Sequence, residues 1–345
     1  MSAVEVEKSE PAAHSAIAPP RYPALLARFA VGLIAAALLT SALLIVMDPY
    51  ETGRLEPLPS IHWRANEAKT SRATDPAFDS AIIGNSRMMM IRPELLDERT
   101  GLKFVSLAIP GTQAREHLRV LRYVLQHHPQ PRALVIGFDE TWCFNPLPRS
   151  AAFEDWAYER GALNYILHLY GIGTVKKIYH LATDPVRSDQ REDGFMDYEP
   201  AFHAAGADRP EIVSAKLFQP RPTVPFTSTG DFPAAEELRQ ILNRVPPATV
   251  VILAWEPVYI MMIPEPGSAA ETALNACRAV YQRIAAARPR TGVVKWFVDR
   301  PENRDEGNFL DRVHYRHGVA TAFGEDIAAA VNGVLTTNTA AVRKQ

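Results

Sequence analysis

The sequence predicts an α/β domain, built on a parallel sheet of five strands, that follows one membrane-spanning helix. Five short apolar runs recur along the chain, and each is followed by turn residues and usually by a helical pattern. The runs are continuously apolar rather than alternating, as expected of strands that are covered on both faces. Strands and helices in alternation place helices on both sides of the sheet and so make three layers. The predicted strands are residues 80–84, 103–109, 132–138, 249–255 and 292–298.

A long apolar run near the N-terminus predicts the membrane helix. Residues 29–47 are 19 residues without a charge, between Arg28 and Asp48. A helix needs roughly 20 such residues to cross the core of a bilayer. A buried globular helix and the core of a cleaved signal peptide are the alternatives. A secretory core usually has only about 7–15 residues and ends in small residues. This run ends in IVMDPY, which favours an uncleaved anchor.

The charges beside this helix predict its orientation. Arg21 and Arg28 precede it, whereas mostly acidic residues follow it. By the positive-inside rule, residues 1–28 form a cytoplasmic tail, and residues 48–345 lie outside the cytoplasm. We therefore expect a single-pass protein of the inner membrane with a periplasmic, or at least extracytoplasmic, domain. The net charge of −2 gives no electrostatic case for binding nucleic acid.

Helical patterns lie between the predicted strands. One begins at Pro93 and stops at Gly101, and another, over residues 112–128, has Thr112 available as its N-cap. Residues 145–235 interrupt the alternation, because nine prolines fall there and no clear strand does. We predict an inserted cap segment over the C-terminal edge of the sheet, where loops build pockets. A structural flap without a role in binding is the alternative.

Cys143 and Cys277 are the only cysteines. In an exported domain they could form one disulfide. Cys143 lies between two aromatic residues and Cys277 lies in a helical pattern, which favours two buried thiols instead. No spacing of Cys and His residues is typical of a metal site, so we expect neither a metal nor a cofactor.

Ser86 ends the first predicted strand, where a parallel sheet binds its ligands. A serine is a weak nucleophile unless a base lies within hydrogen-bond reach and an acid orients that base. Asp311 and His314, three residues apart after the last predicted strand, are the candidate acid and base. A turn serine and an ordinary surface loop are the alternatives.

Four short motifs occur along the chain in an order that resembles that of a known family. The motifs are IIGNSR, SLAIPG, LVIGFD and FLDRVHY, each placed at or after a predicted strand. Together they resemble the SGNH (GDSL-like) hydrolase superfamily, whose sheet is flavodoxin-like. The chain is most similar to the membrane-anchored SGNH-like proteins of bacterial surface-polysaccharide systems, relatives of the alginate O-acetylation proteins. The resemblance implies Ser86 as nucleophile, His314 as base, Asp311 as acid, and Gly111 as a backbone donor beside Ser86 in an oxyanion hole.

Two positions depart from the pattern of the superfamily. Asn85 stands where an aspartate is usual, and Asp139 stands where an asparagine usually donates to the oxyanion. An ionised carboxylate at position 139 would repel an oxyanion. Either Asp139 has another role, or two backbone donors form the hole, or the protein is not a competent hydrolase.

Several side chains beside these motifs have more than one interpretation. Arg87 is a candidate for binding an anionic sugar or for carrying surface charge, and residues 88–90 (Met-Met-Met) are predicted to pack in the core. Trp255 and Tyr259, at the end of the fourth predicted strand, are candidates for stacking on a sugar ring or for core packing.

The function that follows from the resemblance is acyl transfer, usually of acetyl, to hydroxyls of a cell-surface polysaccharide. The expected partners are that glycan, the inner membrane and a membrane-embedded acyl donor protein. An esterase that uses water would need the same residues. A catalytically silent scaffold, which binds a glycan or a membrane partner, is the alternative. Asn85 and Asp139 favour the scaffold, whereas the set of Ser86, Asp311 and His314 favours the enzyme.

Overall fold

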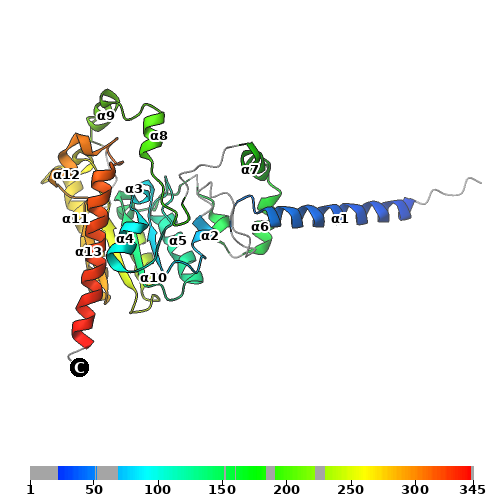
Figure 1. Ribbon diagram of the computed structural model, residues 1–345, viewed down its shortest axis with the longest axis horizontal. Coiled ribbons are helices and arrows are strands. Elements are labelled where there is room, and N and C mark those ends of the chain that lie inside the picture. Colours follow the sequence, from blue (N-terminus) through cyan, green and yellow to red (C-terminus); the bar gives the residue numbers. More distant parts are fainter. Residues whose placement is uncertain are drawn as a thin grey trace, which may run out of the picture. The chain divides into compact units, whose positions relative to one another are not determined.

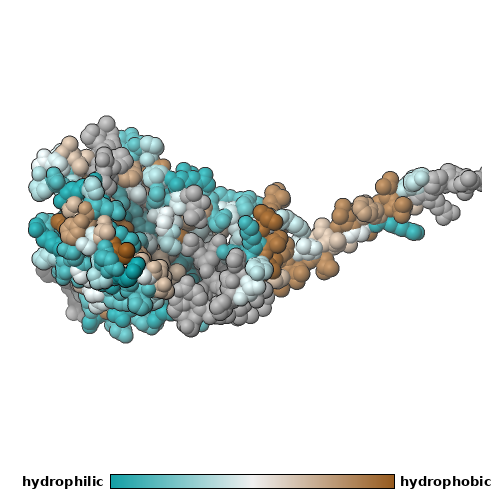
Figure 2. All heavy atoms as spheres, turned by 90° about the horizontal axis from the view of Figure 1, so that it is seen from above, coloured by the Kyte–Doolittle hydropathy of each residue, from teal (hydrophilic) through white to brown (hydrophobic). Residues whose placement is uncertain are grey.

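The computed structural model describes residues 22–50, 52, 69–150, 153–159, 161–183, 191–221 and 230–342. Most of the predicted cytoplasmic tail lies outside these residues. The chain divides between Met47 and Asp48 into two units. The first holds helix α1 (Tyr22–Met47), drawn in dark blue in Figure 1 and largely covered by hydrophobic side chains in Figure 2. By its length and composition α1 is either a membrane anchor or a signal sequence.

The second unit, Asp48–Gln345, contains one parallel sheet of five strands, as predicted. Four strands lie within the predicted apolar runs and the fifth begins one residue before its run; all but the last are fully buried, because helices cover both faces. The strand order is β2-β1-β3-β4-β5. The chain therefore reverses direction across the sheet between β1 and β3, and the crevice at the C-terminal ends of those two strands is where such sheets bind ligands. The strands are β1 (Ser80–Ile83), β2 (Phe104–Ser106), β3 (Ala133–Phe138), β4 (Val250–Trp255) and β5 (Thr291–Lys295).

Helices cover the two faces of the sheet (Figure 1). α4 (Pro93–Thr100) and α13 (His317–Val342) contact each other and share a core with alternate strand residues such as Ile82, Val135 and Ile252. The intervening strand residues face α5 (Ala114–His127), α10 (Pro233–Leu242) and α11 (Ala269–Ala287). The other described helices of this unit are α2 (Lys69–Arg72), α3 (Ser86–Met89), η2 (Glu140–Cys143), η3 (Asp155–Tyr158), α6 (Ala162–Leu169), α7 (Ile172–Thr183), α8 (Glu199–Ala204), α9 (Pro210–Leu217), η4 (Ile260–Met262), α12 (Pro301–Arg304) and η5 (Glu306–Asn308).

The end of α4 agrees with the sequence prediction, whereas the start of α5 differs from it by one residue. Gly101 ends α4 in the left-handed conformation, with φ 67°. The N-cap of α5, however, is Gln113 rather than the predicted Thr112, because Gln113 and Glu116 form a capping box. The Thr112 hydroxyl instead donates to the carbonyl of Ile109, at 2.6 Å, and stabilises the turn before the helix.

The described residues of the predicted insertion form helices joined by turns and contain no strand, and one part of the insertion is fixed to the edge strand β2. The backbone N–H of Ser106 in β2 donates to Asp193 O at 2.7 Å. Buried Lys69 donates to Ser106 O at 3.0 Å and to Gly194 O at 2.6 Å, which joins the two segments. Gly194 has φ 76°, and a Cβ there would collide with Ser106 O, so this close approach requires glycine.

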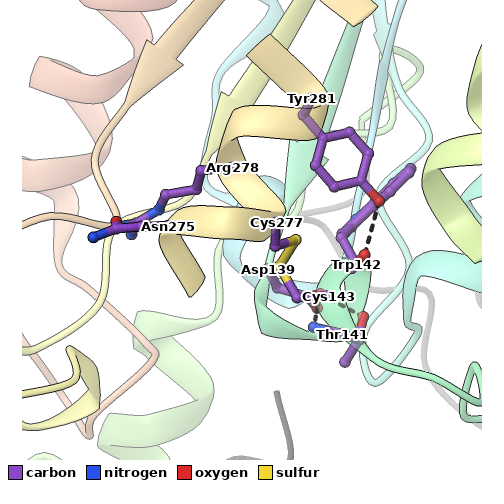
Figure 3. Close-up of a disulfide and its surroundings, with 8 residues drawn as sticks. All are labelled: Asp139, Thr141, Trp142, Cys143, Asn275, Cys277, Arg278 and Tyr281. Atoms are coloured by element: carbon purple, nitrogen blue, oxygen red, sulfur yellow. Dashed lines mark hydrogen bonds between the residues drawn. A yellow bond between two sulfur atoms is a disulfide. The ribbon is translucent and has the colours of Figure 1, made fainter. Parts of the chain in front are cut away.

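The prediction of two buried thiols is wrong, because Cys143 and Cys277 form a disulfide (Figure 3). Both residues are buried, as expected, but the fold brings η2 and α11 together across 134 residues. In Figure 3, Tyr281 of α11 also reaches η2, where its hydroxyl donates to Trp142 O at 2.7 Å. A cross-link that closes so long a loop typically stabilises a domain by about 2–5 kcal/mol.

The core contains the methionines and the two aromatic residues that the sequence analysis singled out. Met88, Met89 and Met90 are all buried, which confirms that prediction. Trp255 and Tyr259 are 2% and 3% exposed, so core packing, rather than stacking on a sugar, is their role.

Candidate active site

Ser86 lies just beyond the C-terminal end of β1, next to β3 in the sheet, as the first residue of the short helix α3. Asn85 caps this helix, because its side-chain oxygen accepts the N–H of Arg87 at 2.9 Å. Gly84 and Gly137 make room beneath the turn, since a Cβ at either position would collide with Met88. The packed turn leaves Ser86 itself partly exposed.

The structure brings together the three residues that the sequence predicts to act as a unit. Ser86 Oγ lies 2.9 Å from His314 Nε2, and His314 Nδ1 lies 2.8 Å from Asp311 Oδ2. A carboxylate only accepts, so His314 carries its proton on Nδ1 and offers Nε2 as acceptor to the Ser86 hydroxyl. The other oxygen of Asp311 accepts the N–H of Val313 and of His314, at 2.9 and 2.8 Å. These bonds fix the carboxylate beside the imidazole that contacts Ser86.

Burial alone would raise the pKa of Asp311, but the hydrogen bond from His314 and the two backbone donors lower it below its ordinary value. The carboxylate therefore stays ionised and orients the imidazole.

Tyr315, which follows His314, joins the histidine loop to the serine turn. Its buried hydroxyl donates to the carbonyl of Arg87, one residue after Ser86. Tyr198 of the inserted segment donates to Tyr315 O at 2.6 Å and lies against the His314 ring, with 5.1 Å between ring centroids. Phe202 of α8 lies 5.4 Å from the same ring. The part of the insertion that is fixed to β2 thus reaches the catalytic histidine candidate.

The backbone N–H groups of Gly111 and Ser86 are the candidate oxyanion donors. Ile109, Pro110, Gly111 and Thr112 form a turn in which Thr112 N–H donates to Ile109 O at 3.4 Å and Gly111 has φ 72°. Ile109 N–H donates to Gly84 O at 2.9 Å, which ties this turn to the serine loop. Within the described part of the chain, neither Gly111 N–H nor Ser86 N–H donates to another group.

The two departures from the superfamily pattern contact each other. Asn85 Nδ2 donates to Asp139 Oδ2 at 2.7 Å, and the other oxygen of Asp139 accepts Thr141 N–H at 2.9 Å and the Thr141 hydroxyl. An amide and a carboxylate are thus paired across the ends of β1 and β3. Asp139 is 2% exposed, and both of its carboxylate oxygens accept hydrogen bonds from these donors. Its role as an oxyanion group stays a hypothesis that this geometry does not favour.

Arg87 is neither exposed nor open to a sugar, contrary to both interpretations from sequence. It is 4% exposed and faces three carboxylates, those of Glu140 at 3.0 Å, Glu256 at 3.2 Å and Asp139 at 3.8 Å. Burial by itself would lower the pKa of Arg87, but the three carboxylates raise it above its ordinary value. The guanidinium is permanently charged and joins the ends of β1, β3 and β4 beneath the nucleophile turn.

Sequence reasoning missed Glu256, Glu140, Tyr315 and Tyr198. A charged residue directly after a buried apolar strand was a usable signal for Glu256, which follows β4. Glu140 and Tyr315 are direct neighbours of residues in the recognised motifs. No pattern marks Tyr198, because only the folded insertion brings it to His314.

The comparisons with known proteins add little to this geometry. No protein-family model and no curated protein matches the chain. Among solved structures, the chain is similar to a carbohydrate esterase family 2 enzyme with a carbohydrate-binding domain from Corynascus thermopiles (Myceliophthora fergusii). The identity is 13%, the match covers 76% of this chain and 67% of that one, and the TM-score is 0.36. At that identity and TM-score the likeness carries no argument about activity.

Glu256 gives a testable pH dependence. Burial, the largest cause, raises its pKa to about 8, although Arg87 opposes this. The folded protein therefore keeps a proton that the unfolded chain loses near the ordinary value of 4.5. The contribution of Glu256 to the free energy of unfolding should fall as pH rises from about 5 to about 8, by up to about 1.4 kcal/mol per pH unit. In Glu256→Gln this decline should be absent, as measured by denaturant unfolding at several pH values.

The exposed Glu98 offers a matched control, since Glu98→Gln should keep the slope of the wild-type protein. Buried His117, whose pKa burial lowers to about 3, titrates with the opposite sign, so the readout is the difference between variant and wild type. Equal slopes for Glu256→Gln and wild type would show that Glu256 is ionised throughout this range.

Proposed function

We propose that the compact unit transfers an acyl group, acetyl in the first instance, to or from hydroxyls of a cell-surface polysaccharide. The observation that carries the proposal is the continuous chain of hydrogen bonds from Ser86 through His314 to Asp311. A nucleophile, a base with the correct tautomer and an acid that fixes it are the minimum that acyl transfer through a serine requires. A turn serine needs none of these partners.

The proposed reaction has two halves. Ser86 Oγ attacks the acyl carbonyl carbon while His314 Nε2 accepts the hydroxyl proton. The N–H groups of Ser86 and Gly111 stabilise the oxyanion, each donor being typically worth about 2.7–4 kcal/mol of barrier. The intermediate collapses, and the departing oxygen takes the proton from His314. A glycan hydroxyl or water then attacks the acyl-serine with His314 again as base, which releases the acyl product and restores Ser86.

Several features support an acceptor outside the cytoplasm. A buried disulfide is typical of proteins in an oxidising compartment. Helix α1 has the length and composition of an anchor, and the arginines before it favour a cytoplasmic N-terminus. The resemblance of the motifs to polysaccharide-modifying proteins supplies the class of acceptor. In this proposal the anchor keeps the enzyme near a membrane-embedded protein that supplies the acyl group.

The three residues should act as one unit in ester cleavage. Replacing Ser86 or His314 by alanine should lower the rate on an aryl acetate by about three orders of magnitude or more. Asp311→Asn should cost somewhat less, because it misorients the imidazole without removing the base. The double variant Ser86→Ala with His314→Ala should be hardly slower than either single variant. Purified full-length protein in detergent and initial-rate kinetics measure this.

The control is that circular dichroism and thermal unfolding of the variants match those of the wild type, because none of the three is an apolar core residue. Rates that are unchanged in all variants would end the catalytic proposal and favour the silent scaffold. Full acylation of surface polysaccharide in cells that carry only Ser86→Ala would separately end the proposed substrate.

The proposed anchor is tested by the intact mass of the protein from membranes. An uncleaved anchor predicts a mass that includes residues 29–47, with the protein extracted by detergent and not by carbonate. A mature chain that begins after this segment would show that α1 is a signal sequence.

A further inference from the structure

Helices α6 and α7 carry an unusual concentration of exposed apolar side chains. Among the described residues of the compact unit, seven large hydrophobic residues are exposed, and six of them lie on this helix pair and its turn. Figure 2 shows hydrophobic side chains gathered at the end of the unit where these helices lie. Monomeric soluble domains rarely expose such a cluster without a partner. The six, with their exposed fractions, are Leu163 71%, Leu167 62%, Tyr170 50%, Ile172 75%, Val175 62% and Tyr179 64%.

The spacing of these residues gives each helix one apolar face. Leu163 and Leu167 are four residues apart in α6, so they lie on the same side of that helix. Ile172, Val175 and Tyr179 repeat at intervals of three and four in α7. Two tyrosines among aliphatic residues are typical of side chains at the boundary of hydrocarbon and water.

The charges of this segment have one sign. Residues 161–183 contain no aspartate or glutamate, and they contain Lys176 and Lys177 in α7. Lys176 is exposed. An apolar face bordered by the exposed Lys176, with no acidic residue in the segment, fits a surface of anionic lipid headgroups.

The helix pair is also attached to the residues where the chain leaves α1. Tyr165 of α6 donates to Asp48 Oδ1 at 3.3 Å, and the hydroxyls of Tyr50 and Thr174 of α7 lie 3.1 Å apart. The ring of Tyr50 packs edge-on against Trp156, with 4.8 Å between centroids. Met47 is covalently joined to Asp48, so the residues that α6 and α7 contact directly follow the proposed span in the chain.

We propose that α6 and α7 bind the lipid interface of the membrane that α1 crosses, with the apolar face of each helix at the boundary of headgroups and acyl chains and Lys176 on anionic lipid. This inference rests on the proposed anchor and goes beyond the proposed reaction. Two attachments, one spanning and one interfacial, restrict rotation of the compact unit about its anchor. A second copy of the chain and a partner protein are the competing occupants of this face.

The experiment uses the full chain in vesicles of phosphatidylethanolamine and phosphatidylglycerol, with an environment-sensitive fluorophore on one introduced cysteine. The native cysteines are bonded to each other and leave the introduced thiol as the reactive one. Ile172→Cys reports α7, Leu33→Cys reports α1, and Gln240→Cys on the exposed side of α10 is the matched control. Nitroxide lipids, labelled near the headgroup or deep in the acyl chain, serve as quenchers.

We expect the label at position 172 to lose emission with the shallow quencher and the label at position 33 to lose it with the deep one. The label at position 240 should keep its emission with both. Adding Leu167→Lys and Val175→Lys to Ile172→Cys should abolish the loss at position 172 without changing the disulfide-bonded fold.

The possible results distinguish a failure of the interfacial contact from a failure of the anchor. Quenching at position 33 without quenching at position 172 overturns the interfacial contact and leaves the anchor standing. The absence of quenching at both positions overturns the anchor and the inference together. A label at position 172 that responds to protein concentration and not to nitroxide lipid shows a second copy on this face, which also overturns the inference.

Discussion

The buried guanidinium of Arg87 is the interaction on which the candidate site depends. It follows Ser86 directly and meets carboxylates that arrive from the ends of β3 and β4, so one side chain ties three strand ends beneath the nucleophile turn. A buried charge is tolerated only when it is paired, and removing one partner of such a pair commonly costs about 3–5 kcal/mol. Three carboxylates around one cation would leave an excess of negative charge. The raised pKa of Glu256 relieves that excess by keeping a proton on the most buried of them.

The sequence predicted those parts of the molecule that local physics determines. Strands covered on both faces must be continuously apolar, so apolar runs such as residues 132–138 predicted the strands of the sheet. The alternation of these runs with helices predicted that the strands are parallel. In a sheet whose strands are all parallel, the C-terminal ends of the strands lie at one edge, and this brings Ser86 and the loop of His314 together. This is why a serine and a histidine separated by 228 residues in sequence could be paired as a hypothesis before any distance was known.

Features that arise only from folded, non-local contacts escaped prediction. The Cys143–Cys277 bond joins η2 to a helix 134 residues away, and neither cysteine has a local pattern that indicates its partner. From the sequence, Arg87 was interpreted as a surface or ligand-binding cation because its carboxylate partners lie far along the chain. Glu140 is 53 residues away, and Glu256 reaches Arg87 only through the sheet. In the sequence, Asn85 and Asp139 were two separate departures from the pattern of the superfamily. Their hydrogen bond makes them one paired feature, which accounts for the tolerance of both without assigning either to the oxyanion.

Activation of Ser86 by His314 is the central claim, and covalent labelling tests it most directly. A fluorophosphonate forms a bond to phosphorus only with a serine whose proton a base removes, and fluoride leaves. Intact-mass and peptide mass spectrometry of the full-length protein should show one adduct on the peptide that contains Ser86, and none in Ser86→Ala or in folded His314→Ala. An unlabelled wild-type protein, or an adduct that persists in His314→Ala, would contradict the account.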